Sequence, residues 1–177
     1  MRLYGITGWK NSGKTGLMER LVAEISARGF SVSTIKHTHH AVDMETQGSD
    51  TWRHRAAGAR QVMLASSARW ALLHEWQQPQ NQEPDDVMAL AARMDAVDLI
   101  LAEGFKTGPH PKIETFRTAA GTGLLAQEDR RIRAVASDGP LPSARADLRC
   151  YDLNDTGAIA DFILTETGLS AQVPAAP

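Results

Sequence analysis

The sequence is poor in cysteine, in long apolar runs and in any excess of one charge, and each shortage excludes a class of protein. The single cysteine, Cys150, cannot form a disulfide within the chain, which favours a reducing compartment, and we expect a cytoplasmic protein. No apolar run reaches the ~18 residues of a membrane span, and the N-terminus lacks a signal-peptide pattern. Because 19 basic residues face 21 acidic ones, nucleic acid is not the expected partner.

One segment of the chain matches a phosphate-binding pattern, G-x-x-x-x-G-K-[ST], at every fixed position. An apolar run at 3–7 precedes it as a strand would, and apolar residues recur at helical spacing after it. A strand, a glycine-containing loop and a helix are the arrangement that phosphate binding requires. We therefore predict that a nucleotide is bound by the glycine loop, which comprises Gly8, Trp9, Lys10, Asn11, Ser12, Gly13, Lys14, Thr15 and Gly16.

The residue types in the glycine loop have separate chemical roles. Gly8 and Gly13 permit backbone angles that bring main-chain N–H groups close to phosphate oxygens, and the following helix directs its positive dipole end at the same place. Lys14 supplies a mobile positive charge for the β- and γ-phosphates, and we assign it a catalytic role. The Thr15 hydroxyl is a predicted ligand of Mg²⁺. Lys10 either contacts phosphate or is a solvated loop lysine.

The order of the expected elements predicts an α/β protein with a mainly parallel sheet. Strands are expected at 3–7, 31–36, 97–102, 112–117, 132–136 and 148–153. Helices are expected at 14–28, at 50–57 with Asp50 as N-cap, at 85–94 and from Asp155 to Gly168. The helix at 85–94 has an apolar stripe of Val87, Met88, Ala91 and Met94, and 121–128 is expected to be a loop. The predicted fold is the three-layer fold of P-loop NTPases, with an added antiparallel β-hairpin at 60–76. We expect one nucleotide-binding domain at 1–168 and a disordered tail at 169–177.

A phosphate loop needs an acidic partner for its metal ion, and the strand at 97–102 is flanked by two candidates, Asp98 and Glu103. The two carboxylates are separated by roughly 16 Å of strand, so only one can be near the nucleotide. Glu103 follows the C-terminal end of the strand, where the glycine loop also opens. We therefore assign Glu103 to the magnesium site and to catalysis, and Asp98 to the start of the strand or to a position facing a helix.

Two further predictions concern ligand contacts, and each has a plain structural alternative. His37, His39 and His40 invite a zinc site with Asp43, but no cysteine pair or spaced fourth ligand accompanies them. We expect His37 to contact phosphate oxygens or a second anionic ligand, with a solvated loop residue as the equal alternative. Asp138 follows a late strand and either accepts two hydrogen bonds from guanine or is an ordinary residue of a Gly-Pro turn.

Several stretches together resemble the molybdopterin-guanine dinucleotide biosynthesis adaptor (MobB) family in order and spacing, from about residue 3 to 165. They are the glycine loop, Ile35-Lys36-His37-Thr38-His39-His40, the residues Asp43, Gly48, Asp50 and Arg55, Ala57-Gly58-Ala59, Arg69-Trp70-Ala71-Leu72, the segment from Asp98 to Lys106, Lys112-Ile113-Glu114, Phe116-Arg117 and Val135-Ala136-Ser137-Asp138. The His-rich stretch and Glu103-Gly104-Phe105-Lys106 are the most specific. The chain departs from the family pattern at Ser49, where a lysine is usual.

The resemblance implies a cytoplasmic GTP-binding protein with Mg²⁺, commonly a homodimer, with slow GTP hydrolysis at most. It also implies a partner protein, the molybdopterin guanylyltransferase, and contact with molybdopterin or its guanine dinucleotide. Trp70, Leu72 and Trp76 alternate onto one face of the hairpin, which is either core or, where exposed, a patch for dimerisation. The phosphate loop alone also fits a small-molecule or nucleotide kinase with a lid at 121–133, or a regulatory protein that binds nucleotide without hydrolysis.

Overall fold

The chain forms two compact units in a computed structural model that describes residues 2–38, 43–76, 86–142 and 145–169. The first unit comprises residues 1–37 and 86–177, and the second comprises residues 38–85. The second unit is therefore inserted into the sequence of the first, an arrangement that the prediction of one domain at 1–168 did not specify. We describe each unit by itself.

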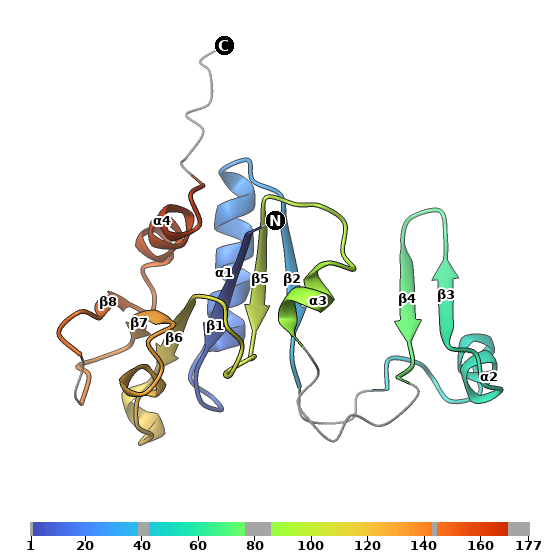
Figure 1. Ribbon diagram of the computed structural model, residues 1–177, viewed down its shortest axis with the longest axis horizontal. Coiled ribbons are helices and arrows are strands. Elements are labelled where there is room, and N and C mark those ends of the chain that lie inside the picture. The colour runs from blue at the N-terminus through green and yellow to red at the C-terminus, as the bar shows by residue number, and fades with distance from the viewer. Residues whose placement is uncertain (1, 39–42, 77–85, 143–144, 170–177) are drawn as a thin grey trace, which may run out of the picture. The chain divides into compact units, whose positions relative to one another are not determined.

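The first unit is built on a six-stranded sheet in the order β2-β5-β1-β6-β7-β8, and every neighbouring pair is parallel (Figure 1). This order confirms the predicted mainly parallel α/β fold. All six expected strands are present, with ends that differ from the expected ones by one or two residues. They are β1 (Arg2–Thr7), β2 (Val32–Lys36), β5 (Leu99–Glu103), β6 (Lys112–Phe116), β7 (Ile132–Ser137) and β8 (Arg149–Asp152).

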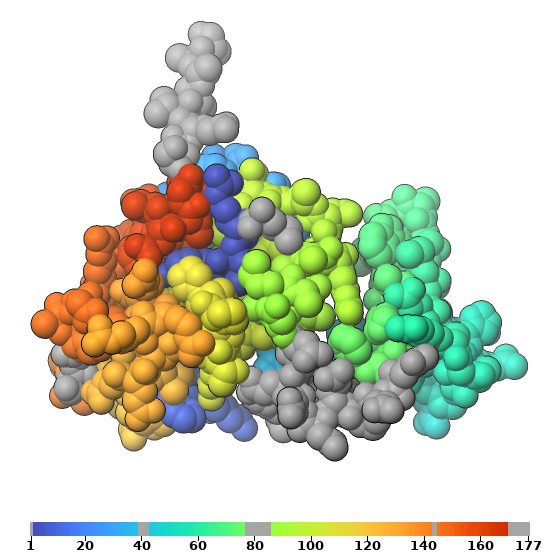
Figure 2. Space-filling view, viewed as in Figure 1, coloured from blue at the N-terminus to red at the C-terminus, as the bar shows by residue number. Residues whose placement is uncertain are grey.

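Helices cover both faces of this sheet. Alternate residues of its central strands point to opposite faces, so each face presents apolar side chains to the helices on that side. Tyr4, Ile6 and Leu101 pack in a core with α1 (Lys14–Ala27) and α4 (Thr156–Glu166). Leu3 and Ile100 pack in a second core with α3 (Val87–Ala91). Figure 2 shows the outer surface of the molecule in the same view, with residues of α4 in red and residues of α3 in yellow-green.

Three predictions of local structure in the first unit differ from the structure. Met88, predicted on the buried stripe of α3, is 44% exposed. The segment at 121–128, predicted as plain loop, contains the short 3-10 helix η2 (Leu125–Gln127), and η1 (Thr118–Ala120) precedes it. Leu169, assigned to the tail, is buried in the main core, while residues 170–177 lie outside the described part of the chain.

The second unit contains one short helix and the predicted hairpin. Helix α2 (Asp50–Ala56) begins one residue earlier than expected, because Ser49 and not Asp50 is its N-cap: the Ser49 hydroxyl accepts a hydrogen bond from the Trp52 amide at 3.3 Å. Strands β3 (Gln61–Ala65) and β4 (Trp70–His74) pair in antiparallel register, which confirms the hairpin.

The apolar face of the hairpin is exposed. Trp70 is 60%, Leu72 44% and Trp76 39% exposed, so these side chains do not form a core. Of the two interpretations, the structure favours a patch available to a partner.

Candidate functional site

The glycine loop follows β1 and turns sharply into α1, and its glycines are required by sterics. Gly8 has φ 143° and Gly13 has φ 95°, both in the region that side chains disfavour. A Cβ atom on Gly8 would lie 2.5 Å from the Ser12 hydroxyl and 2.6 Å from the backbone oxygen of Thr115. This closeness keeps the loop folded tightly against β6, with the N-terminus of α1 uncovered by a side-chain cap.

Side-chain hydrogen bonds hold the glycine loop to its neighbours. The hydroxyls of Ser12 and Thr115 are 2.7 Å apart, and the Thr115 hydroxyl donates to the Thr7 carbonyl at 3.2 Å. The Trp9 indole N–H donates to the Gly123 carbonyl at 2.7 Å, which joins the loop to the segment between η1 and η2. These bonds preorganise the loop, since little conformational freedom remains to be lost when a ligand binds.

Lys14, Thr15 and Glu103 meet at the C-terminal edge of the sheet. The Lys14 ammonium donates to the carbonyls of Gly8 and Trp9 at 3.0 Å and 2.6 Å, within its own loop. The Thr15 hydroxyl donates to Glu103 Oε1 at 3.1 Å, although the two residues are 88 positions apart in sequence. Burial lowers the pKa of Lys14, while the nearby Glu103 carboxylate acts in the opposite direction. The structure therefore brings together the three residues to which we assigned phosphate and metal binding.

Positive charge gathers around Glu103. Lys36, at the end of β2, lies 3.4 Å from Glu103 Oε1, and the Lys106 ammonium lies 4.3 Å from the centre of the Trp9 ring. Four of the five lysines of the chain are at this edge: Lys10 and Lys106 on loops, Lys14 at the start of α1 and Lys36 at the end of β2. Lys10 is exposed. This positive charge would attract a polyanion, for example a nucleoside triphosphate.

His37 and Asp98 lie at opposite ends of the sheet. The backbone N–H of His37 donates to the Glu103 carbonyl at 2.9 Å, and its ring lies 5.2 Å from the ring of Phe105, so this histidine stands at the same edge as the glycine loop. Asp98 instead accepts two hydrogen bonds from Ser31 at the far edge, as expected for a residue at the start of a strand.

The zinc hypothesis gains no support from the described residues. Among them, no group of three or more histidine, cysteine or acidic side chains is placed to hold a metal ion. His39 and His40 lie outside the described residues.

Asp138 lies at the end of β7, at the same edge of the sheet but two strands away from β1. Its Oδ1 accepts from the amide and the hydroxyl of Thr118, at 2.9 Å and 3.2 Å. It lines a hollow of about 510 Å³ together with Ser137, Gly139, Pro140, Leu141, Cys150, Tyr151 and Asp152. Thr118 thus fixes the orientation of Asp138, which lies beside this hollow.

Sequence reasoning missed three residues of this edge. Lys36 and Lys106 belong to stretches that resemble the family but received no role, although Lys36 ends β2 and Lys106 lies three residues after β5. Arg117 directly follows β6, and its Nε would lie 3.2 Å from a Cβ atom on Gly13. The rule that parallel strands present their C-terminal ends at one edge was the signal that could have found all three.

Arg55, one of the residues that carry the family resemblance, lies in the second unit. Its guanidinium contacts the carboxylates of Asp43, Glu45 and Glu75. The hydrogen bond with Glu45 is the main cause that raises the pKa of Arg55.

The strand order, the glycine loop between β1 and α1 and the carboxylate at the end of β5 define a P-loop NTPase-like α/β fold. The family model described as molybdopterin guanine dinucleotide synthesis protein B (MobB) matches residues 3–138, and the chain belongs to this family. No helix among the described residues is long and apolar enough to cross a lipid bilayer.

Two relatives cover nearly the whole chain. The chain is 41% identical to the molybdopterin-guanine dinucleotide biosynthesis adapter protein of Escherichia coli over 167 residues, which are 92% of this chain and 91% of the relative. It is 42% identical to the protein of the same name from Haemophilus influenzae over 161 residues, 91% of this chain and 86% of the relative. A crystal structure of a MobB homolog from Bacillus stearothermophilus has a TM-score of 0.67 and 27% identity, and the match covers 96% of this chain and all of that one.

Proposed function

We propose that this protein is a GTP- and Mg²⁺-binding adaptor in molybdopterin-guanine dinucleotide biosynthesis, which assists the enzyme that transfers GMP to molybdopterin and hydrolyses GTP slowly. The single observation that carries the nucleotide assignment is the meeting of Thr15 and Glu103 at 3.1 Å beside Lys14. The family to which the chain belongs supports the pathway.

The glycine loop supports phosphate binding because the Lys14 ammonium already points into the loop. Lys14 now donates to two carbonyls of its own loop, and phosphate oxygens would replace these carbonyls as acceptors. Backbone N–H groups at the start of α1 and the helix dipole add to the attraction.

The Thr15 hydroxyl and the Glu103 carboxylate fit Mg²⁺, which prefers oxygen ligands. Mg²⁺ would neutralise phosphate charge when bound, while Thr15 and Glu103 orient it at the end of β5. Lys36 lies 3.4 Å from the same Glu103 oxygen, so it would turn from the carboxylate toward phosphate as the metal ion takes its place.

Asp138 supports a preference for guanine. A carboxylate at the base accepts both hydrogen bonds that the guanine N1–H and 2-amino groups donate, whereas adenine offers no such pair. Thr118 donates two hydrogen bonds to one oxygen of Asp138, and Asp138 lines the adjacent hollow, in which a base would bind.

Slow hydrolysis is supported by the state of Arg55. Fast phosphoryl transfer uses an additional cation at the γ-phosphate, and Arg55 is a candidate within this chain for that role. Three carboxylates of its own unit hold its guanidinium, so this side chain is committed elsewhere. Dimerisation is supported by the exposed apolar side chains of the hairpin, because Met63, Leu64 and Trp70 are each more than half exposed.

Calorimetry with GTP and with ATP, each with Mg²⁺, tests the nucleotide assignment. We expect GTP to bind more tightly than ATP, and Lys14→Ala to weaken GTP binding about 100-fold through the loss of a charge-assisted hydrogen bond. Lys10→Ala is the matched control, because that lysine is exposed on the same loop, and it should change affinity less than about threefold. Equal binding of ATP would refute the guanine assignment, and unchanged binding by Lys14→Ala would place the nucleotide elsewhere.

A further inference from the structure

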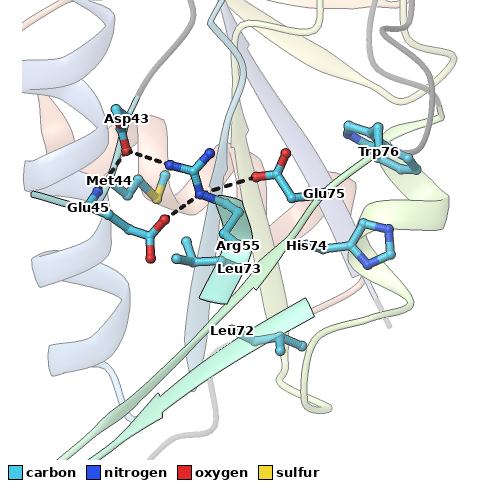
Figure 3. Close-up of a pocket in the computed structure, with 9 residues that line it drawn as sticks. All are labelled: Asp43, Met44, Glu45, Arg55, Leu72, Leu73, His74, Glu75 and Trp76. Atoms are coloured by element: carbon cyan, nitrogen blue, oxygen red, sulfur yellow. Dashed lines mark hydrogen bonds and ion pairs between the residues drawn. The ribbon is translucent and has the colours of Figure 1, made fainter. Parts of the chain in front are cut away.

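The second unit contains a cavity of its own that the nucleotide assignment does not use. It has a volume of about 670 Å³, and the nine residues that line it all belong to the segment 43–76 (Figure 3). They are Asp43, Met44, Glu45, Arg55, Leu72, Leu73, His74, Glu75 and Trp76. A cavity of this volume is large enough for a small heterocyclic ligand.

The charges in this cavity do not balance. Arg55 faces three carboxylates, with Nη2 at 3.5 Å from Asp43 and Nε at 3.6 Å from Glu75 and in direct contact with Glu45 (Figure 3). The four side chains together carry an excess of two negative charges. A ligand that donates hydrogen bonds or carries positive charge would therefore be attracted.

One oxygen of Glu45 is buried and unpaired. The Glu45 side chain is only 4% exposed, and its Oε2 accepts from Arg55, yet its Oε1 has no hydrogen-bond partner among the described residues. An ionised oxygen without a partner inside a protein is costly, and a donor on a bound ligand would remove that cost. Among the described residues, Arg55 Nη1 likewise has no hydrogen-bond acceptor, whereas Nε and Nη2 face the carboxylates of Glu45, Glu75 and Asp43. The cavity thus offers a free acceptor and a free donor side by side.

That pair matches one edge of a particular ring. A 2-amino-4-oxopyrimidine ring, as in pterin and guanine, presents a ring N–H and an amino group as donors next to a carbonyl as acceptor. Carboxylate oxygens can accept from the two donors while an arginine donates to the carbonyl. Trp76 supplies an aromatic surface at the cavity, and Leu72 and Met44 supply apolar contacts for the rest of the ring.

We propose that this cavity binds the 2-amino-4-oxopyrimidine ring of a pterin, with Glu45 and Glu75 as acceptors, Arg55 as donor and Trp76 against the ring. The choice of pterin over guanine rests on the proposed function, since the partner enzyme of that pathway acts on a pterin. The site shares no lining residue with the glycine loop, because every residue that lines it belongs to the second unit.

Binding of unsubstituted pterin, followed by its own fluorescence on the full chain, tests the proposal. Lumazine is the matched ligand control, because it carries an oxo group in place of the 2-amino group, and we expect it to bind at least about tenfold more weakly. Glu75→Gln keeps the shape of the side chain and should weaken pterin binding about tenfold, as should Trp76→Leu.

Two variants of the same unit serve as controls. Asp50→Asn removes an exposed carboxylate outside the cavity, and Trp70→Leu removes an exposed tryptophan of the same hairpin. Both should bind pterin as the unchanged protein does. Equal binding of lumazine and pterin, or equal losses in Glu75→Gln and Asp50→Asn, would overturn the proposal, as would a failure of pterin to bind at millimolar concentration.

Lys14→Ala and guanosine separate this site from the nucleotide site. The Lys14→Ala variant should lose GTP binding and bind pterin normally. A failure of the GTP assignment is therefore distinguishable from a failure of the pterin proposal. Displacement of pterin by guanosine would support recognition of the 2-amino-4-oxopyrimidine ring. It would also show that guanine is a second ligand that supplies this ring. Absence of displacement would support the assignment to pterin.

Discussion

The two units of the chain differ in how far their apolar side chains are buried and how their polar side chains are hydrogen-bonded. In the first unit, apolar residues of β1 and β5 are fully buried between helices, and polar residues such as Thr115 are buried with hydrogen-bond partners. In the hairpin of the second unit, Val62 is buried, whereas Met63, Leu64 and Trp70 are more than half exposed. The first unit thus forms its own core, while the second has exposed apolar side chains and a charged cavity.

This difference determines which parts of the function are readable from a short motif. The proposed phosphate site is formed largely by nine consecutive residues, in which Gly8 and Gly13 have positive φ angles. The cavity of the second unit instead brings Glu45 and Glu75, 30 positions apart in the numbering of the chain, onto Arg55. A site of that kind becomes visible only when the hairpin and α2 are placed together.

The largest expected effect separates a glycine that is crowded from one that is not. Gly8 and Gly58 both have positive φ, at 143° and 106°, but only at Gly8 would an added Cβ atom meet other atoms within 4 Å. Gly8→Ala should lower the free energy of unfolding by about 3 kcal/mol or more, from backbone strain and overlap with Ser12 and Thr115. Gly58→Ala should cost about 1 kcal/mol, from strain alone. Urea denaturation measures both, and equal costs would contradict the steric role of Gly8.

The fold was readable from the sequence because apolar alternation and glycine positions are local signals. The six parallel strands and the hairpin were predicted within one or two residues of their ends. The cap of α2 was misplaced because Ser49 and Asp50 are both short polar residues, and only the backbone angles of Ser49 distinguish them. Met88 was misassigned because α3 has just five residues, too few for a helical stripe to be defined.

Buried charge was the part that sequence could not supply. Lys112 begins a strand and would ordinarily be exposed, yet it is fully buried. Its ammonium donates to the carbonyls of Gly108 and His110 and lies 3.4 Å from Asp129, a partner 17 positions later. Periodicity carries no information on such a partner. Glu114, on the same strand, is buried in the same way and accepts from the amides of Leu125 and Ala126.

A second prediction concerns His110, which is buried beside Lys112 and Arg131 in the first unit. Burial, with smaller contributions from these two cations, lowers the pKa of His110 from 6.5 to about 4. Between those pH values the unfolded chain binds a proton that the folded chain does not, so stability falls as pH decreases through this window. The loss between pH 7 and pH 5 should be about 2 kcal/mol.

Urea denaturation at the two pH values checks this, with two variants for comparison. His110→Leu should remove the corresponding part of the pH dependence, because no imidazole remains to be protonated. His54→Gln changes an exposed histidine of the second unit and should leave the dependence as it was. An unchanged dependence in His110→Leu would show that this imidazole takes up its proton in the folded protein.

The smallest expected effect on stability comes from the exposed hairpin, where the comparison between the two units is most direct. Met63→Ser and Trp70→Ser, at positions 58% and 60% exposed, should each change the free energy of unfolding of the monomer by less than about 0.5 kcal/mol. If this surface joins two copies of the chain, the same changes should weaken self-association about tenfold or more, since apolar side chains dominate such contacts. Light scattering over a dilution series measures the association. A monomer at every micromolar concentration, or a dimer indifferent to both substitutions, would show that these apolar side chains are reserved for a different molecule.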